Sequence, residues 1–373
     1  MNASPAAPSR RTARSHGRVR FRRRAAVAIA CALLLSGCGV RFDAPPPTEP
    51  VPDPVEIVRR TAVDDALHVA EQAEAVAALR KTRPKVAETL TDIAEVSRRH
   101  ADQLGGEYES GLQSDPPSPT PTELAEIPPG AGAVLTTLSD AAARSATAAD
   151  VCEDGTLARL LASISAAQTL SARKLAAATG RPQPAYTPPV VPGSGDETAP
   201  APSAAPSDDG ADATEESDTT TAALTPSARP TTPPVGVAEA DLVAIILAED
   251  STAYALEVRA AQADDETVRE RLANRAETHR RRAEGWARVA GVDGTGADPR
   301  RAAYELPGAE VTSQDVLLQA EGRIAAGYAS LVGLAEADTR AVAVALLTDS
   351  AIAQNSWGAP MISFPGLPEQ AAS

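Results

Sequence analysis

The sequence is poor in cysteine, and this excludes a fold that disulfides hold together. It has three cysteines in 373 residues, and no pair of them has the Cys-x-x-Cys spacing of redox and zinc motifs. Cys31 and Cys38 belong to an N-terminal targeting segment, so Cys152 alone remains to act as a thiol and no disulfide can form within one mature chain. The chain also lacks a glycine-rich phosphate-binding loop, and its scattered Ser and Asp residues show no spacing that predicts a Ser-His-Asp triad.

The sequence also lacks an apolar run long enough to cross a bilayer. Met1–Arg24 holds eight Arg and no acid, and the apolar run that follows, Ala25–Leu35, has eleven residues. A basic start, a short apolar stretch and small residues before Cys38 are typical of a signal peptide. The run Leu35-Ser36-Gly37-Cys38 resembles a bacterial lipoprotein signal, in which cleavage leaves the lipidated Cys at the new N-terminus. An ordinary signal peptide with an accidental Cys is the alternative.

The resemblance to a lipoprotein signal implies a protein located at the cell membrane. Acyl chains such as palmitate on Cys38 would anchor it to the outer, extracytoplasmic face, and two chains anchor firmly where one does not. Removal of residues 1–37 takes away eight Arg and no acid, so the formal net charge changes from −15 to −23. A surface this acidic argues against nucleic acid as a partner.

The remaining sequence divides by composition and periodicity into helical and non-helical parts. Apolar residues at three-to-four spacing predict two sets of four helices, and β alternation fits neither set. Pro-rich or Pro/Ala/Thr/acid-rich stretches lack such periodicity and cannot bury enough surface to offset their ordering entropy. The predicted parts are a signal peptide (1–37), a tether (38–53), a first bundle (54–184), a disordered linker (185–237), a second bundle (238–358) and an irregular tail (359–373).

Both bundles show the same sequence of connections: short, long, short. In the second, tight reversals are expected near residues 262–265 and 335–338, and about twenty residues, 291–312, are expected to connect the second and third helices. Two hairpins joined by one long crossover are typical of the ferritin-like arrangement. The first bundle repeats the pattern, with helices expected at 54–81, 84–105, 131–150 and 154–180. The resulting prediction is an all-α fold of tandem ferritin-like four-helix bundles, with two unrelated sets of hairpins as the alternative.

A resemblance to a known family is carried by two stretches of the second bundle. These are His279-Arg280-Arg281-Arg282-Ala283-Glu284-Gly285-Trp286 and the crossover run Ala302-Ala303-Tyr304-Glu305-Leu306-Pro307. Residues 238–357 resemble a ferritin-like domain family of unknown function that occurs in lipoproteins of high-GC Gram-positive bacteria. The resemblance implies the fold and implies no known reaction.

Four polar residues lie on the apolar stripes of the second bundle, one on each helix: Glu249, His279, Glu321 and Asp349. Di-iron bundles carry a Glu on two helices and Glu-x-x-His on the other two. Here Ala276 precedes His279 by three residues and Ile352 follows Asp349 by three, so both Glu-x-x-His pairs are broken. The four residues are expected to form a buried hydrogen-bonded cluster without a cofactor. The alternative is a site for one cation such as iron or manganese.

The sequence therefore indicates architecture and address more than activity. Arg280, Arg281 and Arg282 are expected to form a solvated face paired with nearby Glu residues, or else a docking surface for an acidic partner. The expected function is non-enzymatic: an interaction or scaffold module that binds an unidentified envelope protein. The alternative is a metal-binding or redox bundle.

Overall fold

The computed structural model describes residues 50–110, 130–186, 189, 192, 231–306, 308 and 310–370. All regular secondary structure among these residues is helical, so the predicted all-α fold of tandem helical bundles is confirmed. The first four helices are α2 (Pro54–Ala77), α3 (Pro84–Gln103), α4 (Ala131–Val151) and α5 (Gly155–Thr179). The second four are α6 (Glu239–Gln262), α7 (Glu266–Val289), α8 (Ser313–Leu334) and α9 (Ala341–Ser356), and a short 3-10 helix, η1 (Pro368–Gln370), follows.

Local sequence signals set most of the helix starts. Proline occupies the first turn of α2 and of α3, where its missing N–H has no intrahelical partner to lose. Asp265 caps α7 by accepting from the Val268 N–H. The cap of α8 is Thr312, which accepts from the Asp315 N–H.

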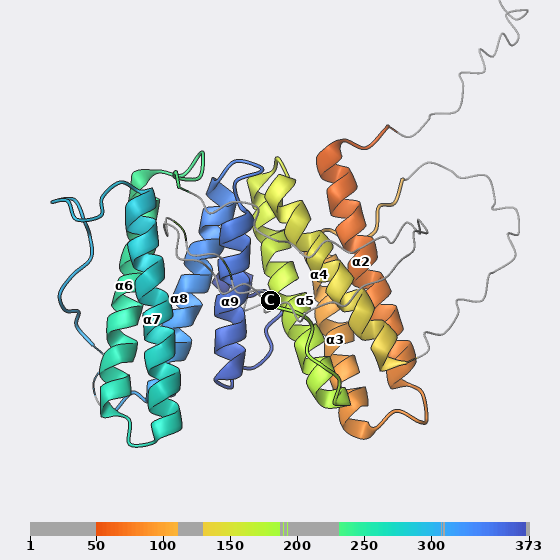
Figure 1. Ribbon diagram of the computed structural model, residues 1–373. Helices are drawn as coiled ribbons and strands as arrows, with labels where there is room; N and C mark the ends of the chain where they lie inside the picture. Colours follow the sequence, from red (N-terminus) through yellow and green to blue (C-terminus); the bar gives the residue numbers. More distant parts are fainter. Residues whose placement is uncertain are drawn as a thin grey trace, which may run out of the picture. The chain divides into compact units, whose positions relative to one another are not determined.

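The helices pair into four hairpins that lie side by side in the order α2/α3, α4/α5, α8/α9, α6/α7 (Figure 1). The inner hairpins join the two bundles, because α5 packs against both α8 and α9 and their buried side chains form one core. Gly155 allows this approach: a Cβ atom there would lie 2.3 Å from the carbonyl oxygen of Gly333. The bundles are thus halves of one packed unit.

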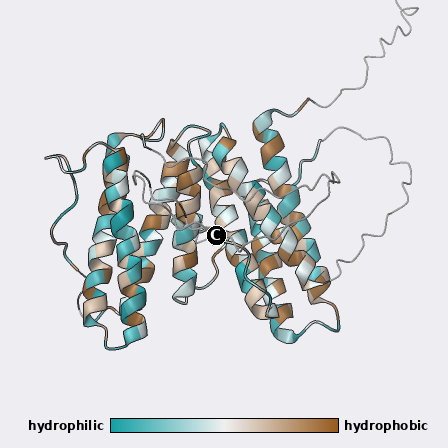
Figure 2. Ribbon diagram, in the orientation of Figure 1, coloured by the Kyte–Doolittle hydropathy of each residue, from teal (hydrophilic) through white to brown (hydrophobic). Residues whose placement is uncertain are grey.

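Hydropathy follows the packing of each helix. Figure 2 shows α7 as largely hydrophilic, whereas α8 and α9, which contact neighbours on more sides, are more hydrophobic. The polar character of α7 matters for the site, because several of its charged side chains point inward. In the described residues no helix is long and apolar enough to span a bilayer.

The segments that follow the last helix of each bundle pack against the other bundle. Seven residues beyond α5, Tyr186 donates its hydroxyl to Asp349 on α9 at 2.5 Å. Seven residues beyond α9, the carbonyl of Ser363 lies 2.8 Å from Nε2 of His100 on α3, and Phe364 packs edge-on against the same imidazole. This reciprocal exchange supports an internal duplication.

Two segments that the sequence predicts to be non-helical take part in this exchange. In the described part of the irregular tail, 359–373, Phe364 and Leu367 are buried and Ser163 donates to the Pro365 carbonyl at 2.7 Å. The predicted linker, 185–237, includes Tyr186 and also Val235, whose carbonyl accepts from the Glu336 N–H at 2.8 Å. Most of that linker, the tether up to residue 49 and the signal with Cys38 lie outside the described residues.

Candidate functional site: a buried charge network

Three of the four predicted polar residues meet at the centre of the second bundle. His279 on α7 lies between Glu249 on α6 and Glu321 on α8, and all three side chains are fully buried. Its Nδ1 is 2.5 Å from a Glu249 carboxylate oxygen and its Nε2 is 3.0 Å from a Glu321 oxygen. Because a carboxylate faces each ring nitrogen, both nitrogens donate when the ring is the imidazolium.

Asp349, the fourth predicted residue, joins this centre through arginine. Arg275 donates from two nitrogens to the two oxygens of Glu321, and its third nitrogen donates to Asp349 Oδ2 at 2.7 Å. Arg282 donates to the same Asp349 oxygen at 2.6 Å. The two guanidiniums therefore connect the acids of α8 and α9, and both belong to α7.

Hydroxyl groups complete the network at its two ends. Tyr328 on α8 donates to the second Glu249 oxygen at 2.5 Å and accepts from the indole N–H of Trp286 at 3.1 Å. Tyr186 donates to the remaining oxygen of Asp349. Burial, followed by the neighbouring carboxylate, raises the pKa of each phenol, so both remain neutral donors.

The network balances three carboxylates against two guanidiniums and one imidazolium. Burial opposes the charge of Glu321, but Arg275 and His279 outweigh it and lower the pKa of this carboxyl to about 2. Burial likewise opposes the charge of Asp349, yet Arg282 and Arg275 hold its pKa well below the usual range. Burial disfavours the imidazolium, but Glu321 and Glu249 reverse this effect and raise the pKa of His279. A neutral sum removes the penalty that an unpaired buried charge would carry.

The donor set fits a bound cation poorly. A metal needs free carboxylate or imidazole lone pairs, but here protein donors occupy both oxygens of Glu249, Glu321 and Asp349. A divalent ion would also lie beside two guanidiniums that cannot lose their charge. Among the described residues, no group of three or more His, Cys, Asp or Glu side chains is placed to hold a metal ion.

Sequence reasoning missed the two arginines that close the network. It placed Arg282 on a solvated face, but Arg282 is 2 % exposed and two of its nitrogens, Nε and Nη1, are buried without a protein partner. The missed signal is heptad spacing: Arg275 and Arg282 are seven residues apart and share a stripe with His279. Tyr186 had no such signal, because it lies outside any helix.

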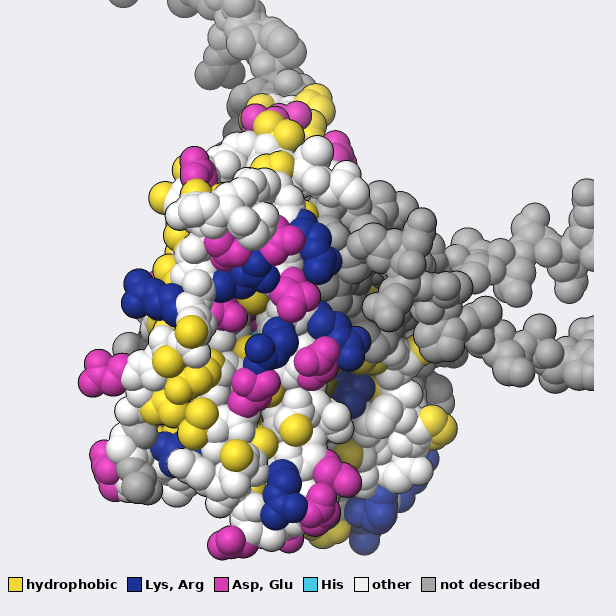
Figure 3. Space-filling model, turned by 60° about the vertical axis from the view of Figure 1, so that its left-hand side comes forward, with side chains coloured by type: hydrophobic (Ala, Val, Ile, Leu, Met, Phe, Trp, Pro, Cys, Tyr) yellow, Lys and Arg dark blue, Asp and Glu magenta, His cyan; other side chains and the backbone are white. Residues whose placement is uncertain are grey.

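The other two arginines of that run behave as the sequence predicts. Arg281 pairs with Glu277 one turn away, and Arg280 pairs with Glu257 on α6. Figure 3, which brings the side of α6 and α7 forward, shows basic and acidic side chains interspersed over this face. Ion pairs between exposed side chains are typical of a solvated surface.

The first bundle does not repeat the network. His100 is fully buried, but it faces the Ser363 carbonyl, and burial lowers its pKa to about 4, so the ring is neutral at pH 7. Gln168 on α5 is buried and accepts from Ser145 at 3.2 Å. Asp65 pairs with Arg144 at the surface. The duplicated bundle therefore has a polar interior without a charged centre.

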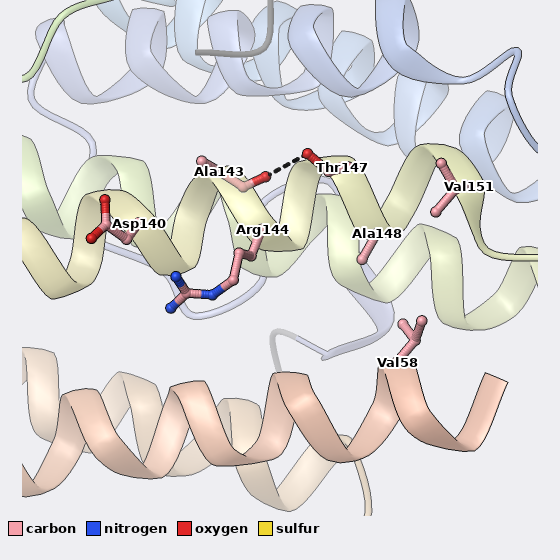
Figure 4. A pocket seen from close by; sticks show the side chains of 7 residues that line it. All are labelled: Val58, Asp140, Ala143, Arg144, Thr147, Ala148 and Val151. Carbon is pink, nitrogen blue, oxygen red and sulfur yellow. Dashed lines mark hydrogen bonds between the residues drawn. The ribbon is translucent and has the colours of Figure 1, made fainter. Parts of the chain in front are cut away.

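A shallow groove on the first bundle is the other candidate site. Figure 4 shows it between α2 and α4, with Val58 facing one wall of α4 side chains. Those side chains are Asp140, Ala143, Arg144, Thr147, Ala148 and Val151. The charged side chains that line the groove are Asp140 and Arg144, and Arg144 is paired with Asp65.

Comparison with known proteins identifies a family model for the second bundle alone. Residues 242–369 match a domain of unknown function, DUF4439. The match extends beyond α9 into the segment that carries Phe364 and Leu367, consistent with their burial in the core. No curated protein and no solved structure matches the chain.

Proposed function

We propose that this chain is a lipid-anchored protein of the cell envelope, a non-enzymatic scaffold or interaction module built on tandem ferritin-like bundles. The anchor is Cys38, which the lipoprotein-like run Leu35-Ser36-Gly37-Cys38 places at the mature N-terminus on the extracytoplasmic face of the membrane. The apolar run before Cys38 is short, which favours a cleaved export signal rather than a transmembrane helix.

One observation carries the non-enzymatic part of the proposal: protein donors engage every acid of the charge network in the second bundle, while Nε and Nη1 of Arg282 have no protein partner. The network's carboxylate oxygens are bonded to protein donors, and its charges sum to zero with His279 protonated. Catalytic acids and metal ligands need a free lone pair or a proton that can leave, and they need access for a substrate. Glu249, His279 and Glu321 have neither, since they are fully buried and paired. Such a network holds four helices in one register.

Metal content tests this part of the proposal. Purified protein, prepared anaerobically, should contain no stoichiometric iron or manganese by elemental analysis. His279→Ala should leave metal content unchanged and lower the free energy of unfolding by about 1–3 kcal/mol, because it removes a donor from two buried carboxylates. Stoichiometric metal in the wild type that is lost in His279→Ala would establish the metal-binding alternative instead.

Membrane fractionation tests the anchor independently. Cys38→Ala should accumulate as unprocessed precursor or appear in the soluble fraction, because the thiol that receives the lipid is gone. Cys152→Ala serves as the control, since its thiol is buried and plays no part in anchoring. A Cys38→Ala protein that stays in the membrane with the mass of the wild type would disprove lipidation at this site.

A further inference from the structure

A cluster of cations marks one tip of the first bundle. Arg80, Lys81, Arg83 and Lys85 belong to the turn between α2 and α3 and to the first turn of α3, and all four are exposed. Arg181 follows α5 at the same tip, where Arg83 donates to the Ala178 carbonyl at 3.0 Å. We define these five residues as the basic tip.

Acids are nearly missing around the basic tip. The stretches that form it, residues 75–91, 130–139 and 169–186, hold seven Lys or Arg residues and one acid, Glu88, and Asp92 just beyond them pairs with Lys174. The turn between α6 and α7 is the counterpart in the second bundle, and there Asp264, Asp265 and Glu266 stand in succession. The basic tip is therefore a property of the first bundle and not of the repeated fold.

The charge of the tip is opposite to that of the whole protein, whose formal net charge is −15 with its signal and −23 without it. At physiological ionic strength the Debye length is about 8 Å, so a partner at the tip senses the nearby cations far more than distant acids. Four exposed cations within six residues then form a local site for a polyanion. Lys binds phosphate as a point charge, and Arg binds it through a planar fork.

Position selects among the polyanions of an envelope. The predicted tether precedes α2 in the chain, whereas the basic tip follows the end of that helix, which is about 36 Å long. The lipid anchor of the proposed function would therefore hold the chain at the end of α2 that is remote from the tip. We propose that the basic tip docks a phosphate-rich polyanionic polymer on the outer side of the membrane.

The test uses the chain from residue 38 onward carrying Cys38→Ala, which cannot take a lipid at that position and so separates this inference from the anchor. Its probe is long-chain polyphosphate, with binding followed by isothermal titration at rising salt. About four phosphate contacts predict a loss of affinity on the order of 20-fold between about 50 and about 150 mM NaCl. The triple variant R80Q/K81Q/K85Q keeps the Arg83 bond to α5 and should bind at least about tenfold more weakly, with a shallower salt dependence.

A matched variant separates the tip from net charge. R280Q/R281Q/R288Q removes the same three charges from surface arginines of α7 and should bind polyphosphate within about twofold of the parent. Circular dichroism melts confirm that both variants are folded. No binding by the parent, or equal losses in both triple variants, would overturn the docking site. Tighter binding to phosphatidylglycerol vesicles than to polyphosphate would overturn the choice of polymer over membrane. None of these binding results bears on lipidation at Cys38, which the membrane fractionation experiment tests separately.

Discussion

Arg275 is the side chain whose removal should disturb the buried network most. It makes hydrogen bonds to both oxygens of Glu321 and to Asp349, and its side chain is 14 % exposed. Arg275→Met keeps much of the aliphatic stem and removes the charge. Glu321 then stays fully buried with His279 as its remaining partner. Removal of one partner from a buried ion pair costs about 3–5 kcal/mol of unfolding free energy, and this is the loss we expect at neutral pH.

The loss should depend on pH in a definite direction. In the wild type the folded-state pKa of Glu321 is about 2, below its unfolded value, so this group stabilises the fold above the unfolded pKa and that stability is lost as pH falls toward 2. Arg275→Met removes the strongest charge interaction that lowers the pKa of Glu321, so this pKa rises. The charged carboxylate then destabilises the variant at neutral pH, and protonation relieves that cost as pH falls. The stability gap between wild type and variant should therefore narrow as pH falls through the ordinary pKa of Glu, about 4.3, toward about 2.

Urea unfolding followed by circular dichroism measures both effects. The matched control is Arg281→Met, which removes an exposed arginine from the same helix and breaks its surface pair with Glu277. We expect the control to lose less than about 0.5 kcal/mol, with little change over the same pH range. A loss below about 1 kcal/mol in Arg275→Met, or a gap that widens on acidification, would refute the assignment of Arg275 as the essential counter-charge.

Three further predictions test the packing. Limited proteolysis should cut within residues 193–230, where the sequence predicts disorder. The two fragments should still co-elute on size exclusion, because α5 packs against α8 and α9. Separate elution under native conditions would contradict the common core. Gly155→Ala should lower unfolding free energy by about 1–3 kcal/mol, since its Cβ would meet backbone of α8, whereas Gly296→Ala, in open space, should be nearly neutral in the same urea assay. Tyr186→Phe should cost about 1–2 kcal/mol by removing the hydroxyl bonded to Asp349, and unchanged stability would mean that this segment does not close the network.

The sequence by itself determined the helices and which of their faces point inward. Periodic apolar residues, Pro54 and Pro84 at helix starts, and the Asp265 cap are local signals, and the observed helices begin where these signals occur. The same periodicity placed Glu249, His279, Glu321 and Asp349 on buried stripes, and the structure brings all four into one network. The 3.6-residue repeat within one helix is enough to identify its inward face, because this assignment does not depend on which residues lie across the interface.

Only the tertiary structure decided how those inward charges are paired. Arg275 reaches Glu321 and Asp349 because the register of α7 against α8 and α9 aligns them, and helical spacing within one element cannot fix that register. Contacts made by non-helical residues cannot be predicted from periodicity at all. Tyr186 contacts Asp349 across 163 residues of sequence, and Ser363 contacts His100 across 263. Both contacts exist because the two bundles pack against each other. That packing brings the segments after α5 and α9 against helices of the other bundle, and the residues of those segments give no sign of it.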